Sequence, residues 1–259
     1  MSTRQPAVAG SFYPQDADEL RDQIVSLLEQ NHRKGTMPKV LIVPHAGYIY
    51  SGPIAAAAYS RLRSGADHIN RVVLLGPSHR VALDGIALPA SGFFETPLGD
   101  IAVDAKTCHR LMAYDQVCES ETAHATEHSL EVHLPFLQVV LSKFEIVPLV
   151  VGSAEPEEVA EILDVVWGGP ETLIIISSDL SHYHSYDKAE AMDAETTAAI
   201  ERLEGHLTGE QACGCNAVNG LMVAARQRQL NVSLIDLRNS GDTAGSKDRV
   251  VGYGAYELH

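Results

Sequence analysis

Short apolar runs alternate along the chain with longer amphipathic stretches. Runs of four to six residues, β-branched and apolar at successive positions, lie at 40–43, 72–75, 146–151, 173–176 and 232–237. Strands that are covered on both faces of a sheet have this composition. Between the runs, helical spacing of apolar residues predicts helices at 16–30, 53–62, 155–166, 187–203 and 217–229.

This alternation predicts an α/β fold: a single domain over residues 1–259, with a mainly parallel central sheet that helices cover on both faces. Residues 93–103 predict a turn with a short strand pair inserted in that scheme. The alternating segment 250–258 predicts an edge strand.

Charge and length exclude several classes of function. Nineteen Lys and Arg face 34 Asp and Glu, a net charge of −15, which disfavours nucleic-acid backbones and anionic membranes as partners. The apolar runs are too short to span a bilayer, and residues 1–10 contain no apolar signal core. Four cysteines in no disulfide pattern fit a reducing compartment. We therefore expect a cytoplasmic protein.

Histidines mark the first candidate site. Of the twelve, His45, His79 and His182 each come just after a predicted strand. Ligands bind outside the carboxyl ends of the strands in open α/β sheets, and imidazole is the commonest metal ligand in proteins. The three side chains therefore predict a convergent metal site, although each alone would suit a locally bonded loop residue.

A second polar cluster spans residues 127–133. His128 and Glu131 would share a helix face at this spacing and could bind zinc, but the HExxH pattern is absent and Pro135 interrupts a continuous helix. The alternatives are a buried polar patch, or a group in which His128, Glu131 and His133 line a pocket or orient metal ligands.

Two further segments carry candidate chemistry. Asp242, in a Gly-rich stretch after the strand at 232–237, would complete a two-His, one-carboxylate metal triad, or would cap a local turn. Cys213-Gly-Cys215 precedes a predicted helix, so these thiols have either lowered pKa values or the role of small buried apolar residues. The chain contains no Gly-rich phosphate loop and no GxSxG elbow.

Several longer motifs resemble those of the Memo family, of the AmmeMemoRadiSam system protein B type. They run through nearly the whole chain: PAVAGSFYP at 6–14, VPHAGYIYSG at 43–52, GPSH at 76–79, EHSLEVHLP at 127–135, SSDLSH at 177–182 and NSGD at 239–242. The fold of this family is similar to that of LigB-type class III extradiol dioxygenases, which are non-haem iron enzymes.

The resemblance implies a site and its cofactor. His45 and His79 stand at the positions of the family's two His ligands, and His182 at the position of the dioxygenase acid/base, with Asp179 placed to orient it or line the pocket. The third ligand is a Cys in the eukaryotic relative, where this chain has Thr243. The neighbouring Asp242 is therefore the expected ligand. The implied cofactor is a divalent ion, with Fe(II) favoured and Zn, Cu or Mn as alternatives.

Three functions remain open. The first is a metal-dependent redox enzyme that acts on a small molecule, with His182 as its general base. The second is a non-catalytic module that binds a peptide or partner in the same pocket. The third is a zinc hydrolase that uses His128 and Glu131. Prokaryotic family members are often encoded beside a radical-SAM protein and a small accessory protein, which the resemblance implies as partners.

Overall fold

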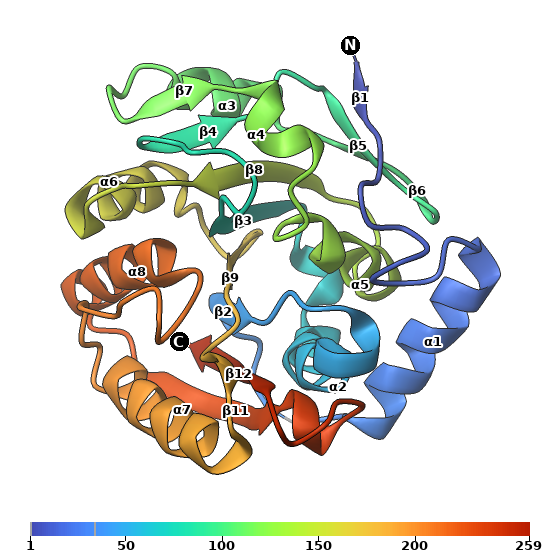
Figure 1. Cartoon of the computed structure of the whole chain (residues 1–259). Coiled ribbons are helices and arrows are strands. Elements are labelled where there is room, and N and C mark those ends of the chain that lie inside the picture. Colours follow the sequence, from blue (N-terminus) through green and yellow to red (C-terminus); the bar gives the residue numbers. More distant parts are fainter. Residues whose placement is uncertain (1, 34) are drawn as a thin grey trace.

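A computed structural model describes residues 2–33 and 35–259 of the chain. Its centre is a large mixed sheet with the strand order β10-β12-β2-β9-β3-β8-β4-β7, and β11 pairs with β12 (Figure 1). The strands of this sheet are β2 Val40–Val43, β3 Arg71–Pro77, β4 Ile86–Leu88, β7 Val117–Glu119, β8 Glu145–Val151, β9 Thr172–Ser177, β10 His182–His184, β11 Val232–Asn239 and β12 Val250–Leu258. The α/β fold expected from the sequence is confirmed.

Helices cover both faces of the sheet (Figure 1). One layer contains α1 Ala17–Gln30, α2 Tyr48–Tyr59 and α5 Leu134–Val140, and the other contains α3 Ala105–Leu111, α6 Pro156–Val166, α7 Tyr186–Glu201 and α8 Cys215–Arg228. The short helix α4 spans Glu121–Ala125. Because side chains alternate along a strand, Leu41 and Val43 of β2 pack in the first core while Val40 and Ile42 pack in the second. This arrangement explains why the central strands are apolar throughout.

The sheet is parallel at its centre and mixed towards its edges, where β4 and β7 form a further parallel pair. Strands β2, β9, β3 and β8 are parallel neighbours, whereas β12 runs antiparallel to β2 and β4 runs antiparallel to β8. The expected strand at 250–258 forms as β12, but the prediction that it lies at an edge is wrong. It pairs with β2 on one side and with β11 on the other, and its first residues also pair with β10. Nearly all residues of β12 are buried. The alternation of residue types in the sequence therefore did not reveal that the strand lies inside the sheet.

The inserted segment 93–103 forms the expected strand pair. Strands β5 Phe93–Thr96 and β6 Gly99–Ala102 are antiparallel, and β1 Thr3–Arg4 adds to β5 as a third strand. Arg4 is buried and forms an ion pair with Glu131 at 2.8 Å. This pair anchors the N-terminal segment to the residues that precede α5.

Helix α2 begins five residues before the predicted start at residue 53, so Pro53 lies inside it. A proline there removes only the hydrogen bond to the carbonyl of Ile49, and Ile49 is 59% exposed at the edge of a pocket. Because α2 starts at Tyr48, its first turn lies close to the carboxyl end of β2, which ends at Val43.

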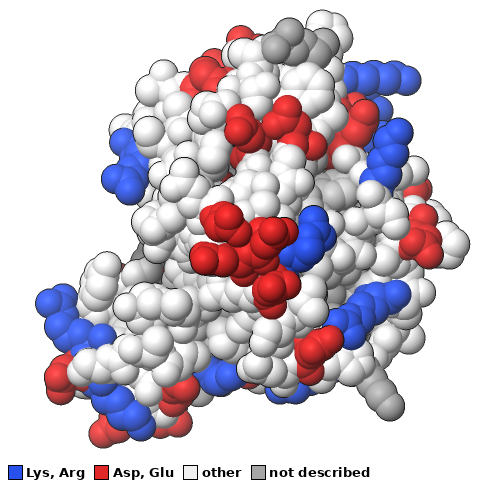
Figure 2. Space-filling model, turned by 90° about the vertical axis from the view of Figure 1, so that its right-hand side faces the viewer, with Lys and Arg blue, Asp and Glu red and all other residues white. Residues whose placement is uncertain are grey.

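The surface reflects the acidic composition. Figure 2 shows acidic side chains gathered near the middle of one face, with basic side chains scattered around them. That face carries no continuous basic patch of the kind that nucleic acid requires. Within the described residues, no helix combines the length and apolar character needed to cross a membrane.

Candidate metal centre

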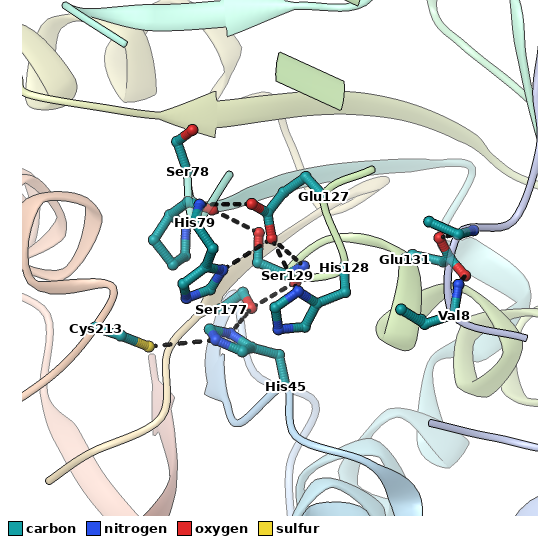
Figure 3. A network of polar contacts seen from close by, with 12 residues as sticks. Val8, His45, Ser78, His79, Glu127, His128, Ser129, Glu131, Ser177 and Cys213 are labelled. Atoms are coloured by element: carbon teal, nitrogen blue, oxygen red, sulfur yellow. Dashed lines mark hydrogen bonds and ion pairs between the residues drawn. The ribbon is translucent and has the colours of Figure 1, made fainter. Parts of the chain in front are cut away.

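Three imidazoles converge at the carboxyl end of the central strands. His45, His79 and His128 each offer one ligand nitrogen, and these nitrogens all lie within 4.8 Å of one another (Figure 3). His45 follows β2, His79 follows β3, and His128 lies in the turn after α4. Among the described residues, no other group of three or more His, Cys, Asp or Glu side chains is close enough to hold a metal ion.

Hydrogen bonds fix the orientation of His45. Its Nδ1 lies 2.6 Å from Oγ of Ser177, the last residue of β9. That hydroxyl donates to the Ser129 carbonyl at 2.6 Å, so it must accept from His45 Nδ1–H. His133 Nε2 donates to the same oxygen at 2.8 Å and Tyr59 donates to His133 Nδ1 at 2.8 Å. The lone pair of His45 therefore resides on Nε2, ready for a metal.

A carboxylate orients His79 in the same way. Oε1 of Glu127 accepts from Nδ1 of His79 at 2.9 Å, while Oε2 accepts from the His79 backbone at 2.6 Å. An Nδ1–H bonded to a carboxylate leaves Nε2 free for a metal. Burial raises the pKa of Glu127, but the hydrogen bonds and charge of His79 outweigh it, and the resulting pKa is about 2. Glu127 is therefore ionised at neutral pH.

His128 completes the cluster. Its ring stacks on that of His79 with 4.7 Å between centroids, and its Nδ1 lies 3.3 Å from Oε1 of Glu127 without hydrogen-bond geometry. Burial lowers the pKa of His128 to about 4, and burial together with the charges of its histidine neighbours holds the pKa of His45 well below its usual range. These two rings are therefore neutral at pH 7, the form that binds metals.

The cluster lines a pocket of about 740 Å³. His182, in β10, and Asp179, in the loop after β9, line the same pocket, so the structure brings together the histidines that follow three strands. Asp179 is buried and accepts the backbone N–H of His45 at 2.8 Å. Burial raises its pKa to about 7, against the lowering effect of that hydrogen bond.

The predicted third ligand lies elsewhere. Asp242 ends a short 3₁₀ turn, where one carboxylate oxygen accepts the Asn239 N–H at 2.9 Å and the other accepts the Tyr186 hydroxyl at 2.6 Å. This is the local cap that the sequence offered as an alternative. The Thr243 hydroxyl donates to the Ser240 carbonyl. Neither Asp242 nor Thr243 belongs to the imidazole cluster or to the described lining of the pocket.

The segment 127–133 does not form the helix on which His128 and Glu131 would share a face. A 3₁₀ turn spans Glu131–His133, and α5 starts at Leu134 with Pro135 in its first turn, where proline is tolerated. The buried Glu131 carboxylate accepts from the Tyr13 hydroxyl and pairs with Arg4. It belongs to the anchor of the N-terminal segment and lies outside the pocket lining.

Contacts of the site also involve residues that sequence reasoning did not assign to it. Ser177 and Glu127 orient two of the ligands, and Cys213 places its Sγ 3.2 Å from Nε2 of His45. The Cys213-Gly-Cys215 pattern before a helix was the available signal. Burial raises the pKa of Cys213 above its usual range, and the nearby Asp179 adds to this. The lowered thiol pKa considered from the sequence is wrong for this residue.

Two basic residues lie at the pocket. Arg80 and Arg249 belong to its lining, and the Arg249 guanidinium sits 5.2 Å from the ring centroid of Tyr183. Tyr183 has a φ of 61° and is 63% exposed. A left-handed backbone conformation is costly for such a bulky residue. The strained residue Tyr183 is thus part of the pocket lining.

Comparison with known proteins gives a consistent result. The family model described as "Memo-like protein" matches residues 4–257. A MEMO1 family protein of Aquifex aeolicus is 37% identical, with 98% of each chain covered. MEMO1 family proteins of Thermoplasma volcanium and Methanothermobacter thermautotrophicus are each 35% identical, over 96% of this chain and 96% and 98% of their own.

Proposed function

The chain belongs to the Memo family, and from this membership and its three converging imidazoles we propose that it is a metal-dependent oxidoreductase of the non-haem iron type, related to extradiol dioxygenases and acting on a small molecule. One observation carries the proposal: ligand nitrogens of His45, His79 and His128 lie within 4.8 Å of one another in a pocket. Such a site has room for both an ion and a substrate.

The residues fit a divalent ion. Ser177 and Glu127 each bond the Nδ1 of a ligand ring, so that Nε2 is the free donor on His45 and His79. Imidazole donors suit Fe, Cu and Zn better than Mg or Ca, and we favour Fe(II). A redox-active ion, when bound, would supply electron transfer in this pocket. The protein would supply the ligands, the pocket and the proton acceptor.

His182 is the proposed proton acceptor. It lines the pocket with the three ligands, and burial lowers its pKa below the usual value. A neutral imidazole at pH 7 can take a proton from a substrate hydroxyl and return it later. Asp179 is the proposed positioning residue, because its carboxylate holds the His45 backbone in place.

The basic residues favour an anionic substrate. Of the described lining residues, Asp179 alone carries a carboxyl group, and its raised pKa reduces its charge at neutral pH. Within the described part of the chain, neither Arg80 nor Arg249 forms an ion pair with a carboxylate. The pocket is thus locally positive in a chain of net charge −15, which favours a carboxylated ligand.

Oxygen uptake tests the proposal. The protein is loaded anaerobically with Fe(II) and then exposed to oxygen with a panel of catechols, some of them carboxylated. We expect uptake that needs both iron and substrate, and a loss of roughly 100-fold or more in His182→Gln. His184→Gln is the matched control, since His184 is in β10 but outside the described pocket lining. Iron binding without oxygen uptake on any substrate would count against this reaction class.

A further inference from the structure

Strand β10 contains a bulge at the pocket. His182 pairs with Val251 and His184 with the preceding Val250, so Tyr183 is the extra residue of this bulge. Its φ of 61° is left-handed, a conformation that glycine normally adopts at such a position. Bulges redirect a side chain and are common beside active sites. The strained backbone therefore sets the direction in which the Tyr183 side chain leaves the strand.

The two most exposed large apolar side chains of the described residues both line the pocket. Tyr183 is 63% exposed and Ile49, in the first turn of α2, is 59% exposed. Exposed apolar surface gathered at one concave site, rather than scattered singly, is typical of a surface that binds a ligand. These two side chains therefore mark an apolar part of the pocket that is open to solvent.

The pocket exceeds what a single aromatic ring needs. Its volume is about 740 Å³, within the roughly 300–1,000 Å³ of sites that take drug-sized ligands. A simple catechol that chelates an ion at the three imidazoles would fill only part of this space. The remaining volume includes the part lined by Tyr183 and Ile49.

The surroundings of Tyr183 suit contact with another ring. The Arg249 guanidinium lies over the Tyr183 ring at 5.2 Å from its centroid, and the His182 ring meets it at 5.8 Å with an interplanar angle of 68°. These contacts orient the ring while much of it remains exposed. Phe12 and Tyr50 also line the pocket. Aromatic rings pair preferentially in stacked or edge-to-face arrangements, so this lining favours an aromatic ligand group over an aliphatic one.

We propose that Tyr183 is a specificity-determining residue, which together with Ile49 binds a second aromatic ring of the substrate, beyond the ring that chelates the metal. The substrate class is then an aryl-substituted catechol. This inference rests on the proposed function for the place of the chelating ring. It concerns ligand binding and does not depend on the reaction with oxygen, so the two can fail separately.

Calorimetric titration tests the proposal. The Fe(II)-loaded protein is titrated under anaerobic conditions with catechol, 3-phenylcatechol and 3-cyclohexylcatechol. We expect the phenyl compound to bind at least roughly tenfold more tightly than catechol, because a ring becomes buried. It should also bind roughly 2- to 10-fold more tightly than the cyclohexyl compound, because aromatic pairs gain beyond the buried area.

Variants assign these preferences to residues. Tyr183→Leu should remove the preference for phenyl over cyclohexyl, and Tyr183→Phe should keep it. Ile49→Ala should lower affinity for both substituted catechols and leave that for catechol unchanged. Val25→Ala is the matched control, since Val25 is an exposed apolar residue of α1 outside the described pocket lining. Thermal unfolding verifies that each variant is folded.

The outcomes separate the hypotheses. Equal affinity of the wild type for catechol and 3-phenylcatechol, or a phenyl preference that persists in Tyr183→Leu, would overturn the role of Tyr183 and leave the metal centre intact. Equal affinity for the phenyl and cyclohexyl compounds would overturn the aromatic substrate class. Binding of none of the three catechols would overturn both this inference and the proposed function.

Discussion

The hydroxyl oxygen of Ser177 lies 2.6 Å from Nδ1 of His45 and accepts a hydrogen bond from its N–H. Because Ser177 donates its own hydrogen to the Ser129 carbonyl, it can act only as an acceptor toward the ring. This one contact determines which nitrogen of a buried imidazole faces the pocket. Glu127 does the same for His79. Metal sites commonly depend on such partners of the ligands.

Ser177→Ala should weaken metal binding without abolishing it. The ring of His45 loses its fixed tautomer, and His133 loses an acceptor in the core. We expect metal affinity to fall by about 10- to 100-fold and the free energy of unfolding by about 1–3 kcal/mol. Chelator competition and urea unfolding measure the two effects. Ser60→Ala, a buried hydroxyl bonded to the Ala57 carbonyl outside the pocket lining, should lower stability alone.

Glu131→Gln should destabilise the fold and spare the metal centre. The substitution leaves Arg4 buried without its charged partner, and breaking such a pair costs about 3–5 kcal/mol. Urea unfolding and metal content of the folded protein are compared with those of the wild type. Loss of metal in the folded variant would instead support the zinc hydrolase, in which Glu131 works with His128.

His124 should make stability depend on pH. Burial lowers its pKa from 6.5 to about 4, although its hydrogen bond to the Ala87 carbonyl opposes this. Between these values the unfolded chain binds a proton that the native ring excludes, so the free energy of unfolding falls as pH falls through this window.

His124→Gln, which removes the titrating group, should flatten that dependence. The measurement is urea unfolding from pH 7 to pH 4, with exposed His109→Gln as the control. A dependence equally steep in His124→Gln and in the wild type would assign the proton uptake to other groups.

Arg249→Gln should discriminate between charged and neutral ligands. We expect affinity for 3,4-dihydroxybenzoate to fall by about tenfold or more, as for a lost hydrogen bond to a charged group, while affinity for catechol stays the same. Calorimetric titration of the metal-loaded protein measures both. Arg110→Gln, whose guanidinium bonds the Val165 carbonyl outside the pocket lining, is the control. Equal losses for both ligands would indicate general damage to the pocket.

Much of the architecture was predictable from the sequence because the apolar runs of the central strands are buried on both faces. The position of a His directly after such a run fixed His45 and His79 at one edge of the sheet. The third imidazole, His128, was harder to assign. Helical spacing suggested that it shares a helix face with Glu131, whereas the helix starts only at Leu134, with Pro135 in its first turn.

Long-range contacts account for the rest. Cys213 is 168 positions from His45 in the chain, and no local pattern reports a contact of that range. Asp242 was ambiguous for the opposite reason. A carboxylate in a Gly-rich turn can cap the backbone or bind a metal, and the bonds of Asp242 to Asn239 and Tyr186 are visible only in the folded chain.

The decisive measurement is the metal content of purified protein, determined by mass spectrometry after equilibrium dialysis against Fe(II) under anaerobic conditions. We expect one ion per chain in the wild type and in Asp242→Ala, and loss of the ion in His45→Ala, His79→Ala and His128→Ala. Retention of a full complement in the three histidine variants, or its loss in Asp242→Ala alone, would contradict a centre built from these three imidazoles.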